Sequence, residues 1–219
     1  MPRCAKFTEA QILESTTRVA AANGPAATTM AAIAGALRAP TGSIYHRFPS
    51  RDVLLGEVWL RAATSFQDGY FDILGRPVAR AAGLAAALYL PQRVRVNLAE
   101  ARILLLYRRE DFLAPNWPEE LRARAAGLQR QVDGGLQGFS RRLFGRADHK
   151  TLRLVTYALL DAPLAAVHRH VAANEIPPDH VDALIRATYF ATLALGDGQA
   201  GDFSAKYQRR LQRARATDR

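Results

Sequence analysis

The sequence predicts an all-α protein, and two observations support this class. Alanine, leucine and arginine dominate the 219 residues, whereas isoleucine and valine, which favour strands, are sparse. Apolar residues recur three and four positions apart along much of the chain, and no alternating run is long enough for a strand. We therefore expect an N-terminal helical bundle, a long connecting helix and a larger helical domain.

The first two helices are marked by their capping residues. Thr8 and Gln11 have the spacing of a capping box, so the first helix is expected to begin near Thr8. The sequence Asn-Gly-Pro at 23–25 ends it. Thr28 or Thr29 then caps a second helix, whose apolar residues at 30, 33, 34 and 37 form one stripe.

A short third helix is expected at 40–47, because Pro40 suits the first turn of a helix. Only Ile44 and Phe48 give this segment an apolar face, and its other face is polar around Gly42. A helix this short is unstable alone, so it depends on those two anchors. Ser50 caps a fourth helix that continues to about residue 72 and would link the bundle to the rest of the chain.

The remainder of the chain is expected to form further helices, separated by glycine and proline. Pro91 is expected to interrupt one of them and Pro163 to kink another. The expected segments are 78–90, 95–109, 119–146, 151–173 and 179–195. We divide the chain into a helix-turn-helix DNA-binding domain (1–54), a helical effector-binding and dimerisation domain (55–199) and a basic tail (200–219).

The formal charge of +10 is concentrated at the two ends of the chain. Residues 1–51 and 200–219 each carry a net charge of +4, so the long middle carries little. This pattern indicates a polyanionic partner, although arginine used for solubility explains it equally well. The single Cys4 excludes an intrachain disulfide, and the absence of a signal peptide or of a long apolar run favours a cytoplasmic protein without a membrane partner.

The stretch IAGALRAPTGSIYHRFPSRDVLL resembles the DNA-binding domain of TetR-family transcriptional regulators, and the resemblance covers about residues 8–59. It rests on a threonine-led helix, a short turn, the sequence G-S-I-Y-H-x-F and then P-S-basic-x-x-L-L. One departure concerns the turn, where the family usually has glycine and this chain has Arg38. Left-handed backbone geometry there would cost Arg38 about 1 kcal/mol.

The resemblance and the helix pattern together predict the residues that contact DNA. Pro40, Thr41, Gly42 and Ser43 would face the base edges, since Gly42 allows close approach and Thr41 offers a methyl group to thymine. The other predicted contacts are to phosphates: Thr28 and Thr29 at a helix N-terminus, and Tyr45, His46, Arg47 and Arg51. Tyr45 as a core aromatic and His46 as a plain surface residue are the alternatives.

The resemblance also implies a homodimer formed by the helices within 151–195, and a small-molecule effector that changes the spacing of the two recognition helices. The expected dimer stripes are Leu159, Leu160, Leu164 and Val167 with Leu184, Ile185, Tyr189 and Leu193, for which an intramolecular core is the alternative. An apolar or aromatic effector would contact Phe66, Tyr70, Tyr107, Trp117, Tyr157 and His168, unless these are ordinary core residues.

Other functions fit the sequence less well. No motif of a hydrolase, metalloprotease or nucleotide-binding enzyme is present, and His168 and His170 are two positions apart, which on a helix separates them. We therefore expect no catalytic residues, metal site or cofactor. The expected function is a transcriptional regulator, most simply a repressor, that binds a double-stranded DNA operator. The alternative is a nonspecific or constitutive DNA-binding protein without an effector.

Overall fold

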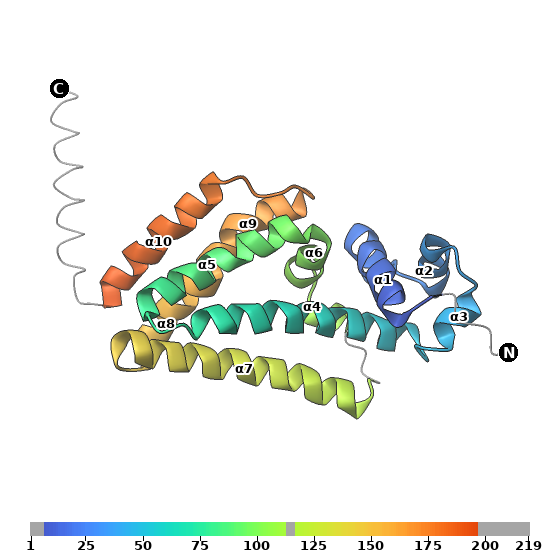
Figure 1. Ribbon diagram of the computed structural model, residues 1–219, viewed down its shortest axis with the longest axis horizontal. Coiled ribbons are helices and arrows are strands. Elements are labelled where there is room, and N and C mark those ends of the chain that lie inside the picture. The colour runs from blue at the N-terminus through green and yellow to red at the C-terminus, as the bar shows by residue number, and fades with distance from the viewer. Residues whose placement is uncertain (1–6, 113–116, 197–219) are drawn as a thin grey trace, which may run out of the picture.

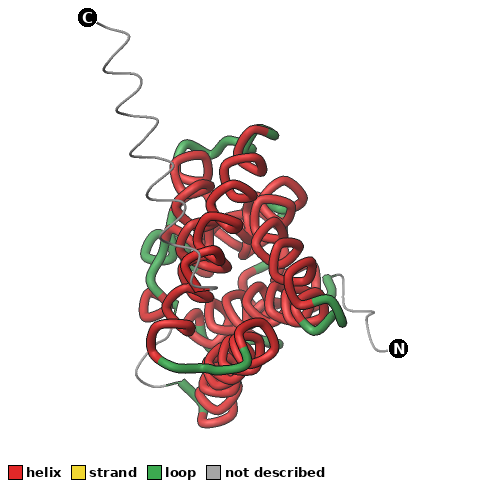
Figure 2. Tube along the Cα trace, turned by 90° about the vertical axis from the view of Figure 1, so that its left-hand side faces the viewer, coloured by secondary structure: helices red, strands yellow, loops and turns green. Residues whose placement is uncertain are grey.

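The computed structural model describes residues 7–112 and 117–196. Over these residues the chain forms helices and loops, without a strand, which confirms the predicted fold class (Figure 1; Figure 2). The helices α1–α3 form a small bundle at one end of the molecule, and the others form a larger body (Figure 1). The predicted basic tail lies outside the described residues.

The small bundle consists of α1 (Glu9–Asn23), α2 (Met30–Leu37) and α3 (Thr41–Tyr45). Thr8 caps α1 with the predicted capping box, and Gly24 follows its end. Thr29, rather than Thr28, caps α2 by accepting a hydrogen bond from the amide of Ala32 at 3.1 Å. The buried residues that hold the three helices together are Ile12, Met30, Ile33, Ala34, Ile44, Phe48 and Leu54.

The helix α4 (Arg51–Leu74) joins the small bundle to the larger body. Ser50 caps it, as predicted, by accepting a hydrogen bond from the amide of Val53. Its first turns place Leu54 in the core of the small bundle, and its last turns place Tyr70 and Leu74 in the main core. A 24-residue helix is about 36 Å long, so one rigid element contributes to both cores.

The prediction that Pro91 interrupts a helix is wrong. The helix α5 (Ala79–Val96) continues through Pro91, which is buried. Proline removes one backbone hydrogen bond, but the residues on either side, Ala87 and Val94, are fully buried in the main core. This packing holds the helix together beyond the proline. The next helix, α6 (Leu98–Leu106), is shorter than predicted and is capped by the side chain of Asn97.

The remaining helices complete the larger body. The helix α7 (Glu119–Phe144) runs beside α4 (Figure 1) and ends at Gly145, which is left-handed. The helix α8 (His149–Thr156) continues as a π-helical segment η2 (Tyr157–Asp161) into α9 (Ala162–Ala172), and α10 (His180–Gly196) follows. The kink predicted at Pro163 is therefore a widened, π-helical turn just before the proline. Proline has no backbone N–H to donate to the preceding turn.

The two predicted dimer stripes divide between the interior and the surface. Leu164 and Leu184 are exposed, with 38% and 58% of their surface accessible. Leu160 is half-buried and packs against the main core of the protomer. The remaining five members are buried in that core, which corrects the expectation that they face a second copy: Leu159, Val167, Ile185, Tyr189 and Leu193. The helical spacing of these residues predicted buried faces correctly, but those faces pack on α5 within the same protomer.

Candidate nucleic-acid interface and interior cavity

The turn between α2 and α3 is tight and left-handed. Arg38 has φ 53° and ψ 42°, the conformation that favours glycine. The amide of Ala39 donates to the carbonyl of Ala34 at 2.9 Å, so the turn satisfies the open carbonyls at the end of α2. The turn thus has the geometry that a glycine would adopt, and Arg38 bears the steric cost.

The helix α3 is held by two side chains, as the sequence predicts. Ile44 is fully buried and Phe48 is 5% exposed, and both belong to the core of the small bundle. Pro40, Gly42, Tyr45 and His46 are exposed, while Thr41, Ser43 and Arg47 are half-buried. With 50% of its surface accessible, Tyr45 is not a core aromatic. The exposed face of α3 is therefore polar and built on a fixed backbone.

Gly42 leaves open space at the start of α3, whereas Ser43 leaves a hydrogen-bond acceptor there. A Cβ atom built on Gly42 would meet no atom within 4 Å, so the packing of this chain does not require glycine there. The Ser43 hydroxyl donates to the carbonyl of Pro40 at 2.7 Å, which uses its proton and leaves its lone pairs as acceptors. The surface at the start of α3 is thus bare at Gly42 and can accept a hydrogen bond at Ser43.

Of the two threonines predicted to contact phosphate, only Thr29 is exposed at the N-terminus of α2. Thr29 is exposed beside the first-turn amides of Met30 and Ala31, which a helix cannot pair internally. Thr28 is fully buried, and its hydroxyl donates to the carbonyl of Gly24 at 2.8 Å. The expectation that the Thr28 side chain contacts phosphate is therefore wrong, because the hydroxyl closes the loop between α1 and α2.

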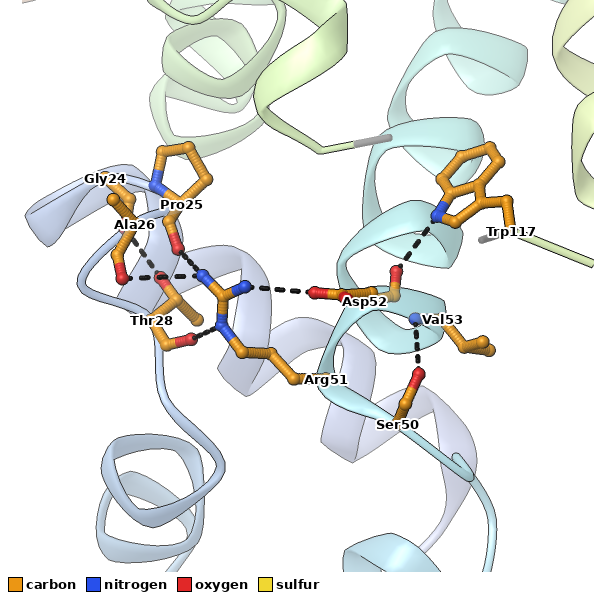
Figure 3. Close-up of polar contacts among 9 residues, drawn as sticks. All are labelled: Gly24, Pro25, Ala26, Thr28, Ser50, Arg51, Asp52, Val53 and Trp117. Atoms are coloured by element: carbon orange, nitrogen blue, oxygen red, sulfur yellow. Dashed lines mark hydrogen bonds and ion pairs between the residues drawn. The ribbon is translucent and has the colours of Figure 1, made fainter. Parts of the chain in front are cut away.

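Arg51 lies at the start of α4 and points toward that same loop (Figure 3). Its Nε donates to the carbonyl of Thr28 at 2.6 Å, and Nη2 donates to the carbonyls of Pro25 and Ala26. Its Nη1 pairs with Asp52 at 3.1 Å. The guanidinium, predicted to contact a phosphate, thus has its donors engaged within the protein and holds the loop before α2 against α4.

Trp117 fixes the other side of the same turn of α4. Its indole Nε1 donates to the carbonyl of Asp52 at 3.2 Å (Figure 3), and the ring is 3% exposed. Leu60, Leu121 and Ala125 form a small core with it, between α4 and α7. Trp117, predicted to contact an effector, is therefore a packing residue at the base of α7.

A cavity of about 370 Å³ lies in the larger body, between α4, α5, α6 and α7. Its wall is mainly apolar, with Trp59 and Phe66 contributed by α4. Its polar members include Arg93 and Glu100, which form an ion pair at 3.1 Å. Two further polar atoms of the wall, Gln67 Oε1 and Arg109 Nε, are buried and have no hydrogen-bond partner in the described part of the chain.

Of the six residues predicted to contact an effector, Phe66 alone lines this cavity. Tyr70 is buried in the main core and donates to the carbonyl of Leu159, and Tyr107 packs against Gly24 and Phe112. Tyr157 and His168 are exposed, the former beside a surface groove of α8 and α10. These placements correct the prediction: aromatic residues near mid-chain were selected by type, whereas the cavity arises from four helices far apart in sequence.

Trp59, Gln67 and Arg109 line the cavity although no sequence pattern predicted them as effector contacts. Trp59 and Gln67 lie on the buried side of α4, and Arg109 lies in η1 (Arg109–Asp111), a 3-10 turn after α6. The guanidinium carbon of Arg109 lies 5.5 Å from the centre of the Trp59 ring. No sequence pattern identifies this pair, because the two residues come together only when α6 packs on α4.

In the described ranges, no group of histidine, cysteine and carboxylate side chains could hold a metal ion. His168 is exposed, whereas His170 is 7% exposed and accepts a hydrogen bond from Arg169 Nε at 3.2 Å. The helices of the described part include none that is long and apolar enough to span a bilayer.

Comparisons with known proteins agree with this geometry. Residues 12–58 match the sequence model of a family described as bacterial regulatory proteins, tetR family. No curated protein sequence matches the chain. The interval 12–58 contains α2, the turn, α3 and the start of α4.

The fold is similar to that of several solved regulators. A TetR-like transcriptional regulator from Rhodococcus sp. RHA1 superposes with a TM-score of 0.65 at 20% identity, over 85% of this chain and 95% of that one. FadR from Bacillus subtilis, solved in complex with stearoyl-CoA, gives 0.65 at 17% identity over 84% and 97%. The TetR family regulator PfmR from Thermus thermophilus gives 0.62 at 20% identity over 86% and 96%.

Proposed function

Because the chain belongs to the tetR family of bacterial regulatory proteins, we propose that it is a repressor that binds a palindromic DNA operator as a homodimer and is released by a small molecule. Its DNA-binding unit is residues 1–54, and residues 55–199 form the effector-binding and dimerisation unit. The observation that carries this proposal is the polar, exposed face of α3, which two buried side chains hold on a rigid bundle.

The residues at the surface around α2 and α3 have separate roles in this proposal. Pro40, Thr41, Gly42 and Ser43 read base edges in the major groove, where the bare surface at Gly42 permits close approach. Thr29 with the first amides of α2, and Tyr45, His46 and Arg47 at the end of α3, bind phosphates and fix the register. Arg51 supports this surface from behind through the loop before α2.

A dimer supplies the second half-site. A single five-residue helix reads few base pairs, so two copies spaced by about one helical turn of DNA make a usable operator. The predicted dimer surface, within 151–195, keeps large exposed apolar side chains after folding: Tyr157, Leu164, Leu184, Phe190 and Leu195. Apolar residues exposed in one region of a protomer are typical of an interface.

The cavity is the proposed effector site. The helix α4 begins three residues after the anchor Phe48, and its middle turns carry Trp59 and Phe66 into the cavity wall. A ligand that favours one position of α4 would shift the position of α3 and thereby the spacing of two recognition helices. Arg102 provides a second connection, since its guanidinium donates to the carbonyls of Ala21 in α1 and Val171 in α9.

Selection of genomic fragments by the purified full-length protein tests the DNA-binding proposal. We expect a palindromic motif with two half-sites, because the proposed dimer has two recognition helices. A set of bound fragments without a common motif would instead support a nonspecific DNA-binding protein. A motif whose affinity no small molecule changes would support a constitutive regulator.

Three variants then test the separate roles on α3. Thr41→Ala and Gly42→Ala should change which bases are preferred, and should alter the difference in binding free energy between operator sequences by about 1–3 kcal/mol. Arg47→Ala should instead weaken binding to all sequences and reduce the salt dependence of binding. Gly134→Ala, at a helical glycine of α7 that also has open space around it, is the matched control. Equal losses of specific and nonspecific binding in all three variants would contradict this division.

A further inference from the structure

The cavity carries one positive charge that the described residues do not neutralise. Of its two arginines, Arg93 pairs with Glu100 at 3.1 Å and also donates to the Ser65 hydroxyl at 3.3 Å. Arg109 makes no ion pair in the described ranges, and its guanidinium lies over the face of Trp59. Glu110, its neighbour in sequence, is exposed and is not part of the cavity wall.

The position of Arg109 is fixed although its charge has no ion-pair partner in residues 7–112 and 117–196. The aromatic face of Trp59 attracts the guanidinium and holds it at the wall of the cavity. Its Nε is buried away from solvent and lacks an acceptor among the residues that the structure describes. A buried donor without a partner is unfavourable, and guanidinium pairs best with the two oxygens of a carboxylate or a phosphate.

The other residues of the cavity wall indicate the chemistry of the part of a ligand that lies away from Arg109. Trp59, Phe66, Leu90, Leu104, Leu105 and Leu128 offer an apolar surface. Gln67 Oε1 is a buried acceptor without a donor in the described part of the chain, so it can receive one hydrogen bond from a ligand hydroxyl or amide. A volume of about 370 Å³ lies in the range of small-molecule sites.

We propose that this cavity binds an apolar monoanion, a hydrophobic carboxylate whose charged group pairs with Arg109 while its aliphatic or aromatic body lies against Trp59 and Phe66. The regulatory role of this ligand rests on the proposed function, whereas its binding depends only on the residues that line the cavity. A cation would meet Arg109 with no free carboxylate in the described wall to compensate, because Glu100 is already paired with Arg93.

Ligands that share an apolar body and differ in the charge and type of head group test this proposal on the full-length protein without DNA. Decanoate, decanol and decyltrimethylammonium, each below its micellar concentration, compare three head groups on one chain, and 2-naphthoate with 2-naphthol repeats the comparison for an aromatic body. We expect the two carboxylates to bind at least tenfold more tightly than their neutral partners, measured by calorimetry and by the shift in melting temperature. Tighter binding of the alcohols or of the ammonium, or binding of no probe, would overturn the proposal.

Arg109→Gln and Arg108→Gln provide a matched pair of variants. Arg108 is adjacent and exposed, and it does not line the cavity. Arg109→Gln should reduce the preference for carboxylate over alcohol to within about twofold, because the charge that creates the preference is gone. Arg108→Gln should retain it. A preference that survives Arg109→Gln would show that another group binds the anion.

Operator binding in the presence of each probe separates this proposal from the proposed function. If carboxylates bind at Arg109 without changing operator affinity, the ligand class holds and the regulatory role of the cavity fails. If neutral or cationic compounds release the operator through the cavity, the regulatory role holds and the ligand class fails.

Discussion

The indole ring of Trp117 lies directly on Gly56, while its Nε1 donates to the carbonyl of Asp52 at 3.2 Å. A Cβ atom on Gly56 would lie 2.0 Å from Cζ2 of the ring, so the two residues are matched in size. This contact connects the start of α7 to the first turns of α4. It therefore lies between the recognition helix and the cavity.

Gly56→Ala should displace the Trp117 ring and break its hydrogen bond. Overpacking of this kind costs about 1–3 kcal/mol of unfolding free energy, which exceeds the gain in helix propensity from alanine. Denaturant unfolding measures the loss. Gly134→Ala, in open space on α7, should be neutral or stabilising, and a Gly56→Ala variant as stable as this control would contradict the contact.

Arg51→Ala should lower the free energy of unfolding, and it should have a smaller effect on the free energy of binding to DNA phosphates. Its guanidinium binds three carbonyls of the loop before α2, and hydrogen bonds from a charged donor contribute about 2 kcal/mol. Arg51→Lys should restore little, since an ammonium group cannot span the same carbonyls. Thermal unfolding and the salt slope of DNA binding separate the two effects. A reduced salt slope with unchanged stability would assign Arg51 to phosphate instead.

Arg38→Gly should stabilise the protein by about 1 kcal/mol relative to Arg38→Ala. Both substitutions remove the charge, but alanine retains the Cβ atom that is unfavourable at φ 53°. The difference between their free energies of unfolding isolates the backbone strain of the turn. Equal stabilities would mean that the left-handed conformation carries no cost here.

Stability should fall at alkaline pH because two tyrosines are buried in the main core. Burial raises the pKa of Tyr189 to about 12, and burial also raises the pKa of Tyr70. The unfolded chain ionises its tyrosines near pH 10, so this stabilisation is complete below about pH 10 and is lost as the pH rises through the folded pKa.

Tyr189→Phe should reduce this alkaline slope. The variant also loses the hydrogen bond from the Tyr189 hydroxyl to the carbonyl of Arg80, 2.8 Å long, which lowers stability by about 1 kcal/mol at every pH. Denaturant unfolding at pH 7 gives this constant offset, and a series up to about pH 11 gives the slope. An unchanged slope would exclude Tyr189 as a source of the alkaline loss.

Local sequence determined the small bundle and the helix that follows it. The capping residues Thr8, Thr29 and Ser50 and the anchors Ile44 and Phe48 act over three or four positions. Their spacing therefore specifies, to within about a residue, where α1, α2 and α4 begin, and it specifies which side of α3 is buried. Helical spacing also predicted the all-α class, and the resemblance to TetR-family regulators over about residues 8–59 agrees with the family model that matches residues 12–58.

Only the tertiary structure decided which residues serve the cavity, the loop and the core. Arg51 and Trp117 bind carbonyls 23 and 65 positions away along the chain, at separations that no local pattern encodes. Pro91 remains within α5 because the buried residues around it outweigh one missing hydrogen bond. The pairing of Trp59 with Arg109 likewise exists only after α4 and α6 have packed, because helical periodicity says which face is apolar and not which helix will cover it.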